Sequence, residues 1–206
     1  MHRSAPLSFG SLAVRTPLVT ARQRIGLLGG SFNPAHDGHR QISVTALKRL
    51  GLDAVWWIVS PANPLKPTGE LASLADRLAG ARRVAGHARI VITSFETELP
   101  SAFTIGTLRF LRRRHPGACF VWLMGADNLA SVHRWRAWQD IFRLMPVAVL
   151  DRPGWRLRAV ASRAARLFQG SAVPEDRAAI LACRPAPAWT FITLPLSPAS
   201  STEIRR

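Results

Sequence analysis

Cysteine is scarce in this sequence, with only Cys119 and Cys183 among 206 residues. The two lie far apart in the chain, and neither belongs to a C-x-x-C or another metal-binding spacing, which argues against a disulfide framework and a zinc-binding module. A reducing compartment, the cytoplasm, is the expected location. No stretch approaches about 18 consecutive apolar residues, so the sequence also predicts no membrane span.

Acidic residues and lysine are scarce as well. The chain has 28 basic and 12 acidic residues, a net charge of +16, and only Lys48 and Lys66 are lysines. Such an excess attracts partners that carry phosphate, either nucleotides or nucleic acid. Genome base composition can also enrich arginine, and the longest run, Arg112-Arg113-Arg114, suits a solvated helix face. The sequence has no RNP-type aromatic motif and no dense basic tract, so a non-catalytic RNA-binding protein is the less favoured class.

The length of the chain fits one domain with a single core, which needs neither disulfides nor a structural metal. The first 24 residues contain no acidic residue but several serines, threonines and arginines. Organellar transit peptides have this composition, yet a disordered extension explains it too and is the prediction here. We therefore expect a disordered extension over residues 1–23 and one domain over residues 24–206.

From Arg24 onward, short apolar runs alternate with amphipathic stretches. This alternation is typical of α/β proteins, and it predicts a Rossmann-like doubly wound parallel sheet with flanking helices. The expected strands cover residues 25–29, 54–60, 89–93, 118–124, 147–150 and 189–194. The expected helices cover residues 39–50, 71–86, 104–114, 127–144 in two pieces, 157–168 and 174–182.

A glycine-rich segment follows the first expected strand, and its sequence is Gly29-Gly30-Ser31-Phe32-Asn33-Pro34-Ala35-His36-Asp37-Gly38-His39. At this place in an α/β fold, backbone N–H groups and a helix N-terminus form a phosphate site. The spacing matches neither the G-x-G-x-x-G motif nor the P-loop. Instead, His36 and His39 flank Gly38, where phosphate can approach the backbone. Two imidazoles can donate hydrogen bonds to phosphate and can carry positive charge near neutral pH, which suits a transition state that gathers negative charge.

A second candidate phosphate site lies in Ser200-Ser201-Thr202-Glu203-Ile204-Arg205-Arg206. Ser200 and Glu203 have the spacing of a capping box, so a helix is expected to start here. Its N–H groups, two hydroxyls and one guanidinium would point at the same anion. A frayed basic tail would explain this segment if it stood alone.

Together these segments resemble the nucleotidylyltransferase superfamily, and the chain from Arg24 onward is similar to the bacterial nicotinate mononucleotide adenylyltransferases. The other shared motifs follow in the family's order, and they are Asn63-Pro64-Leu65-Lys66, Phe103-Thr104-Ile105-Gly106-Thr107-Leu108, Met124-Gly125-Ala126-Asp127-Asn128-Leu129 and Trp135-Arg136-Ala137-Trp138. The resemblance covers about 180 residues, far more than one chance motif would.

The resemblance implies a reaction in NAD biosynthesis. The phosphate of nicotinate mononucleotide would attack the α-phosphorus of ATP, giving nicotinate adenine dinucleotide and pyrophosphate. Mg²⁺ assists in that family with ATP as co-substrate, and no side chain of this chain is assigned to a metal. No covalent enzyme intermediate is implied, so the protein's task is to position two anions and neutralise charge. The expected partners are these two nucleotides, with neither nucleic acid nor membrane.

Carried over motif by motif, the resemblance implies a role for each candidate residue. The catalytic residues would be His36, His39 and Arg205, which would contact the ATP phosphates. The residues that would bind ATP are Gly29, Gly30, Ser31, Phe32, Gly38, Asp127, Ser201 and Thr202, with Asp127 accepting hydrogen bonds from ribose hydroxyls. The residues that would bind the mononucleotide are Lys66 at its phosphate, and Thr104, Trp135 and Arg136 beside its ring, where the Trp135 indole would stack by a cation–π contact.

Simpler structural roles are open for some of these residues. Thr104 could begin a helix, Trp135 could pack in the core, and Asp127 could cap a helix. The chain also departs from the family, because many members have tyrosine where it has Phe103 and Arg136. Arg136 supplies a charge complementary to a nicotinate carboxylate. The alternative acceptors are nicotinamide mononucleotide and pantetheine phosphate.

Overall fold

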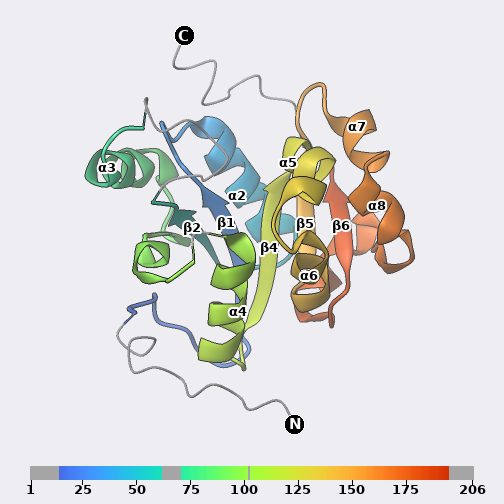
Figure 1. Cartoon of the computed structure of the whole chain (residues 1–206), viewed down its shortest axis with the longest axis horizontal. Helices are drawn as coiled ribbons and strands as arrows, with labels where there is room; N and C mark the ends of the chain where they lie inside the picture. The colour runs from blue at the N-terminus through green and yellow to red at the C-terminus, as the bar shows by residue number, and fades with distance from the viewer. Residues whose placement is uncertain (1–13, 62–70, 102, 195–206) are drawn as a thin grey trace.

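A single parallel sheet of six strands forms the centre of the protein (Figure 1). The computed structural model describes residues 14–61, 71–101 and 103–194. The strand order is β3-β2-β1-β4-β5-β6. The bounds are β1 Arg24–Gly30, β2 Ala54–Val59, β3 Ile90–Thr93, β4 Cys119–Gly125, β5 Val147–Leu150 and β6 Trp189–Ile192. Every strand predicted from the apolar runs is present, with ends that differ by no more than two residues.

The strands are apolar on both faces because helices cover both. All six residues of β2 are buried. Trp56 belongs to the core cluster on one face of the sheet, and Trp57 belongs to the cluster on the other. Successive side chains of a strand point to opposite faces, so a continuous apolar run supplies both cores.

Two layers of helices enclose the sheet. One face is covered by α2 (Asp37–Arg49), α3 (Leu74–Ala85) and η4 (Glu175–Cys183). The other is covered by η1 (Phe95–Glu98), α4 (Thr104–Arg114), α5 (Ala126–Ser131), η2 (Val132–Arg134), α6 (Trp138–Leu144), α7 (Arg156–Val160) and α8 (Arg163–Leu167). Figure 1 shows α4, α5 and α6 in front of the sheet. The doubly wound arrangement predicted from the sequence is confirmed.

Some helices differ from the prediction. The expected helix over residues 157–168 is two helices, α7 and α8, because the side chain of Ser162 accepts a hydrogen bond from the Ala165 N–H and starts a new helix. The helix expected from residue 71 begins at Leu74, where Ser73 caps it. The expected helix over residues 174–182 is the 3₁₀ helix η4, which η3 (Gln169–Ser171) precedes.

Residues 14–23, which the composition assigns to the extension, lie against the domain. Val14 is buried in the core cluster of the α4 face. Thr16 Oγ1 lies 2.9 Å from His115 Nε2, and the Arg22 N–H donates to the Gly117 carbonyl. Residues 1–13 lie outside the described residues. Among the helices that the structure describes, none is long and apolar enough to cross a membrane.

The topology fixes where a ligand can bind. The chain winds outward in one direction from β1 and in the other from β4, and these two strands are neighbours. In sheets of this kind, the loops at the carboxyl ends of such a pair diverge and leave a crevice. The segments after Gly30 and Gly125 border this place.

Candidate active site

Aromatic rings pack against the glycine-rich segment, which begins in the last residues of β1 and continues into the loop after it. A side chain at Gly29 would collide with Trp122, because an added Cβ would lie 2.6 Å from the Cη2 atom of that ring. Phe32 has a φ of 47°, in the left-handed region, and its ring is 1% exposed and stacks on Trp57 at 5.0 Å. Phe32 therefore anchors the loop from within the core.

The two histidines of the motif form a capping arrangement at the start of α2. His36 is the N-cap residue, and its Nδ1 accepts a hydrogen bond from the Gly38 N–H at 3.1 Å. His39 Nδ1 accepts from the His36 N–H at 3.3 Å, and the two ring centroids are 3.9 Å apart. A neutral imidazole with a lone pair on Nδ1 carries its proton on Nε2. Each ring is thereby fixed in the tautomer that donates through Nε2.

His39 is neutral at physiological pH. Burial above all, then the neighbouring His36 and the positive charge of Arg152, together lower its pKa from 6.5 to about 3, although the hydrogen bond with the His36 backbone opposes the change. The expected positive charge is therefore wrong for His39, which can offer a phosphate a neutral N–H group only. The N-terminus of the 13-residue α2 adds the positive end of a helix dipole at the same place.

Hydrogen bonds beneath His39 hold the first turn of α2 in place. Ser43 Oγ donates to the His39 carbonyl at 2.8 Å and accepts from Trp57 Nε1 at 2.7 Å. The ring of Phe32 lies 4.7 Å from the imidazole of His39. These contacts connect the imidazole to the buried β2 strand, so the donor is pre-positioned before a ligand binds.

Arg77 of α3, which was not among the predicted site residues, fixes the loop from the other side. The residue is 3% exposed, and its guanidinium donates to the carbonyls of Ser31, Ser60, Pro61 and Ala72 at 2.7 to 3.0 Å. Burial lowers the pKa of this arginine. One side chain thus joins the glycine-rich loop to the chain that leaves β2, and no sequence motif signals the role.

Asp127 lies across the crevice, in the first turn of α5. Its Oδ2 atom pairs with Arg152 Nη1 at 2.7 Å, and its Oδ1 atom is buried with no hydrogen-bond partner among the described residues. Gly125 is the N-cap of α5, so the simpler role of Asp127 as a cap is wrong. A Cβ at Gly125 would collide with Oδ1, and the glycine leaves room for that oxygen. An unsatisfied buried acceptor of this kind suits a ligand hydroxyl.

Arg152, which follows β5, is a second site residue that was not predicted from the sequence. It pairs with Asp127, and its charge acts on His39, so it lies within electrostatic reach of both sides of the crevice. A basic residue two positions after a predicted strand was the signal available. The carboxyl ends of parallel strands lie at the same edge of the sheet, where ligands bind, so a residue that follows a strand is a candidate ligand-binding residue.

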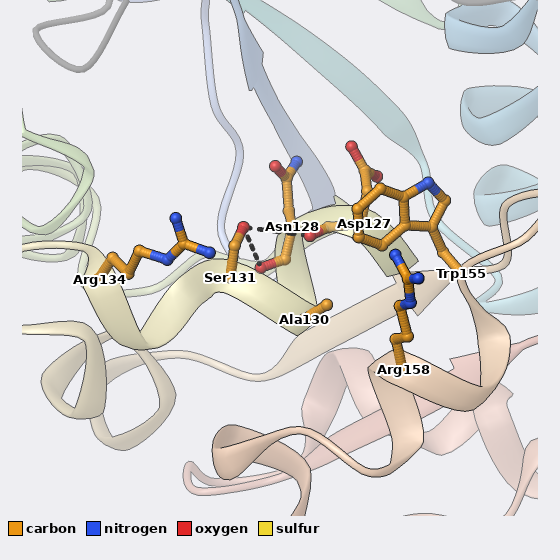
Figure 2. A pocket seen from close by; sticks show the side chains of 7 residues that line it. All are labelled: Asp127, Asn128, Ala130, Ser131, Arg134, Trp155 and Arg158. Carbon is orange, nitrogen blue, oxygen red and sulfur yellow. Dashed lines mark hydrogen bonds between the residues drawn. The ribbon is translucent and has the colours of Figure 1, made fainter.

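A hollow of about 450 Å³ extends from Asp127 along α5 (Figure 2). It is lined by Asp127, Asn128, Ala130, Ser131, Arg134, Trp155 and Arg158. The guanidinium of Arg158 lies 5.7 Å from the Trp155 ring centroid. Polar, basic and aromatic groups therefore border the same space as the Asp127 carboxylate.

The two motifs expected beside the pyridine ring adjoin each other. Thr104 is the first residue of α4, and the guanidinium of Arg136 lies 4.9 Å from the Phe103 ring centroid. Trp135 is half-buried and packs against the core cluster. The structure thus brings the start of α4 next to the segment after η2.

Four predicted site residues, Lys66, Ser201, Thr202 and Arg205, lie outside the described residues. The described residues contain no group of three or more His, Cys, Asp or Glu side chains that could hold a metal ion.

Residues 27–206 match the family model described as cytidylyltransferase-like. The chain belongs to this family. A probable nicotinate-nucleotide adenylyltransferase from Methylorubrum extorquens is 55% identical over 182 residues, which cover 88% of this chain and 98% of that protein. A protein of the same name from Cereibacter sphaeroides is 56% identical over 181 residues, which cover 88% and 95%.

Solved structures share the fold of this chain. The Plasmodium falciparum nicotinic acid mononucleotide adenylyltransferase complexed with NaAD aligns with a TM-score of 0.67 at 16% identity, covering 89% of this chain and 83% of that one. The same enzyme complexed with APC aligns with a TM-score of 0.67 at 15% identity and the same coverage. At these identities the likeness concerns the fold, and it confirms the Rossmann-like prediction.

Proposed function

We propose that this chain transfers the adenylyl group of ATP to nicotinate mononucleotide, which forms nicotinate adenine dinucleotide and pyrophosphate in NAD biosynthesis. The observation that carries the proposal is the histidine pair at the start of α2, opposite the Asp127–Arg152 ion pair at the switch point of the sheet. Relatives at 55 and 56% identity bear the name of this activity, which supports the choice of acceptor.

The described residues can act on ATP as donors and acceptors of hydrogen bonds. His36 and His39 would donate through Nε2 to phosphate oxygens, with the N–H groups of α2 beside them. Asp127 would accept a ribose hydroxyl through Oδ1. An acceptor phosphate oxygen forms the new bond to the α-phosphorus, and the bond from that phosphorus to the bridging oxygen of pyrophosphate breaks. The protein contributes position and charge compensation.

Further charge would come from Arg152 and from groups outside the described residues. We propose Ser201, Thr202 and Arg205 as additional contacts of the ATP phosphates, and Lys66 as the contact of the mononucleotide phosphate. Mg²⁺ would enter with ATP as its magnesium complex, since this ion keeps several waters and binds substrate phosphates in preference to all-protein cages. A cytoplasmic location, which we also propose, agrees with two free thiols among the described residues.

The acceptor ring would lie between the start of α4 and Trp135. The indole would stack on the pyridinium, and Thr104 would contribute its hydroxyl. Arg136, which now covers the Phe103 ring, would pair with the nicotinate carboxylate. A carboxylate would then be favoured over an amide by one charge-assisted contact.

The test is a competition between acceptors. The protein is incubated with ATP, Mg²⁺ and equal concentrations of nicotinate mononucleotide, nicotinamide mononucleotide and pantetheine phosphate, and the products are quantified by mass. We expect pyrophosphate release and mainly nicotinate adenine dinucleotide. A dominant pantetheine product would move the function to that acceptor, and no turnover with either pyridine mononucleotide would overturn the proposal.

Arg136→Gln tests the specificity step separately. We expect it to reduce the preference for nicotinate over nicotinamide by about 10-fold, the effect of one lost charge-assisted hydrogen bond. Arg166→Gln is the control, because Arg166 is exposed on α8 and distant in sequence from the acceptor motifs. An unchanged preference in Arg136→Gln would remove Arg136 from acceptor selection.

A further inference from the structure

The two cysteines, which are 64 positions apart in sequence, lie side by side in the structure. Cys119 begins β4 and Cys183 ends η4, and their sulfur atoms are 4.0 Å apart. At this separation the sulfurs are in van der Waals contact. A disulfide requires about 2.05 Å between them, so bond formation needs the two sulfurs to approach by about 2 Å.

Both cysteines belong to elements, β4 and η4, that pack in the core. Side chains alternate along β4, and Cys119 points to the same face as Val121 and Leu123, which belong to the core cluster beneath η4. Leu181 and Ala182 of η4 are buried in that same cluster, directly before Cys183. The core of the α2 face thus holds the two sulfurs together in the folded state.

The two thiols differ in access. Cys183 is exposed, whereas Cys119 is half-buried. Burial and the neighbouring Cys183 raise the pKa of Cys119, and the charges of Arg22 and Arg112 oppose that rise. Arg24, which is paired with Asp53, also lies within electrostatic reach of both thiols. An outer thiol that can react with a solute therefore lies beside an inner thiol that solutes reach less easily.

We propose that Cys119 and Cys183 form a dithiol site that small disulfides convert into an intramolecular disulfide. The Cys183 thiolate attacks one sulfur of the small disulfide, forms a mixed disulfide and expels one thiolate. The Cys119 thiolate then attacks the Cys183 sulfur and expels the second thiolate. Two electrons pass from the cysteine pair to the small disulfide, and the two cysteine protons leave with the two small thiols.

The bond would join η4 to the start of β4 and close a loop that contains β5 and α5 to α8. Cross-links that close long loops stabilise mainly by restricting the unfolded chain. The site lies at the amino end of β4, about 20 Å along the strand from the end that carries Asp127, given about 3.3 Å per residue. The expected effect is resistance to unfolding, independent of the proposed transfer reaction.

The test uses the full chain and oxidised glutathione. After incubation of the native protein, intact mass spectrometry should show a loss of about 2 Da, the two hydrogens removed by disulfide formation. Peptide mapping should join Cys119 to Cys183. Cys119→Ser should stop at a stable mixed disulfide on Cys183, and Cys183→Ser should remain largely unmodified. The oxidised wild type should also unfold at a Tm higher by about 5 °C or more, a shift that dithiothreitol reverses.

Three results would overturn the proposal. They are a mixed disulfide that persists on the wild-type protein, a disulfide that forms only when urea is present, and equal modification of both thiols without a cross-link. The reduced forms of both serine variants are compared with the wild type by thermal unfolding. If the reduced variants and the reduced wild type have equal Tm values, a variant that forms no cross-link lacks it because the thiol is missing and not because the fold is destabilised.

Discussion

His39 shows how the surroundings of one residue change its chemistry. Its Nδ1 accepts the His36 N–H, and burial lowers its pKa to about 3. We predict that the ring stays neutral, with the proton on Nε2, from about pH 8 down to about pH 5, where an ordinary histidine becomes charged. Nitrogen-15 NMR of the imidazole, assigned with His39→Asn, measures this directly. Protonation of Nδ1 within that range would contradict the tautomer.

The same residue provides a kinetic prediction. His39→Ala removes a donor aimed at charge that develops in the transition state, so we expect kcat to fall by about 100-fold or more. The KM for the mononucleotide should change far less. His87→Ala is the control. His87 precedes β3, so it lies near the amino ends of the strands, whereas His39 lies near their carboxyl ends. A His39→Ala enzyme with unchanged turnover would exclude the imidazole from the mechanism.

The sequence predicted the histidine pair but could not predict its charge. The spacing of His36 and His39 is local, and it places both rings at one helix end whatever the rest of the chain does. The pKa of His39 depends mainly on burial, then on His36 and, to a smaller extent, on Arg152, which follows β5 far along the chain. Of these causes, the motif itself contains only His36.

Helix α3 contributes Arg77 to the support of the glycine-rich loop, and substitutions of this residue test that role. Arg77→Ala would remove the donor from four carbonyls and leave a cavity where the buried side chain was, so we expect the free energy of unfolding to fall by about 3 kcal/mol. The glycine-rich loop would shift, and kcat/KM for ATP should fall about 10- to 100-fold. Urea unfolding and initial rates measure the two effects.

The control for Arg77 lies on the same helix. Arg82 is exposed in the last turn of α3, and Arg82→Ala should change stability by no more than about 0.5 kcal/mol. Arg77→Lys keeps the charge but loses the forked donors, so its loss should approach that of Arg77→Ala. An Arg77→Ala protein with wild-type kinetics and stability would show that the loop needs no such support.

The elements were predictable where local signals are strong. The predicted bounds of α4 and β5 agree with the structure residue by residue, since an apolar face or a buried run defines each. The break between α7 and α8 was missed, although Ser162 is a recognisable cap. A serine inside an amphipathic stretch can either continue a helix or cap a new one. The sequence alone does not decide between these, because the choice depends on how the segments before and after the serine pack.

The site as a whole depends on topology more than on motifs. Asp127 and Arg152 form an ion pair because β4 and β5 are neighbours, and the order of the strands is a property of the complete sheet. The same holds for Cys119 and Cys183, whose contact needs η4 packed under β4. Contacts between residues from distant segments were therefore not predicted from the sequence, whereas the glycine-rich loop, a local motif, was.

The net charge of +16 acts over the whole molecule, and it leads to a prediction about rate. Both proposed substrates are anions, and a strongly basic protein draws them toward its surface from solution. We expect kcat/KM for nicotinate mononucleotide to fall several-fold as NaCl rises from about 0.05 M to about 0.5 M, because the Debye length shrinks. Measured at saturating substrate, kcat should change little, since encounter no longer limits the reaction. If kcat falls as steeply as kcat/KM, salt is disrupting the site itself and the charge does not steer the substrates.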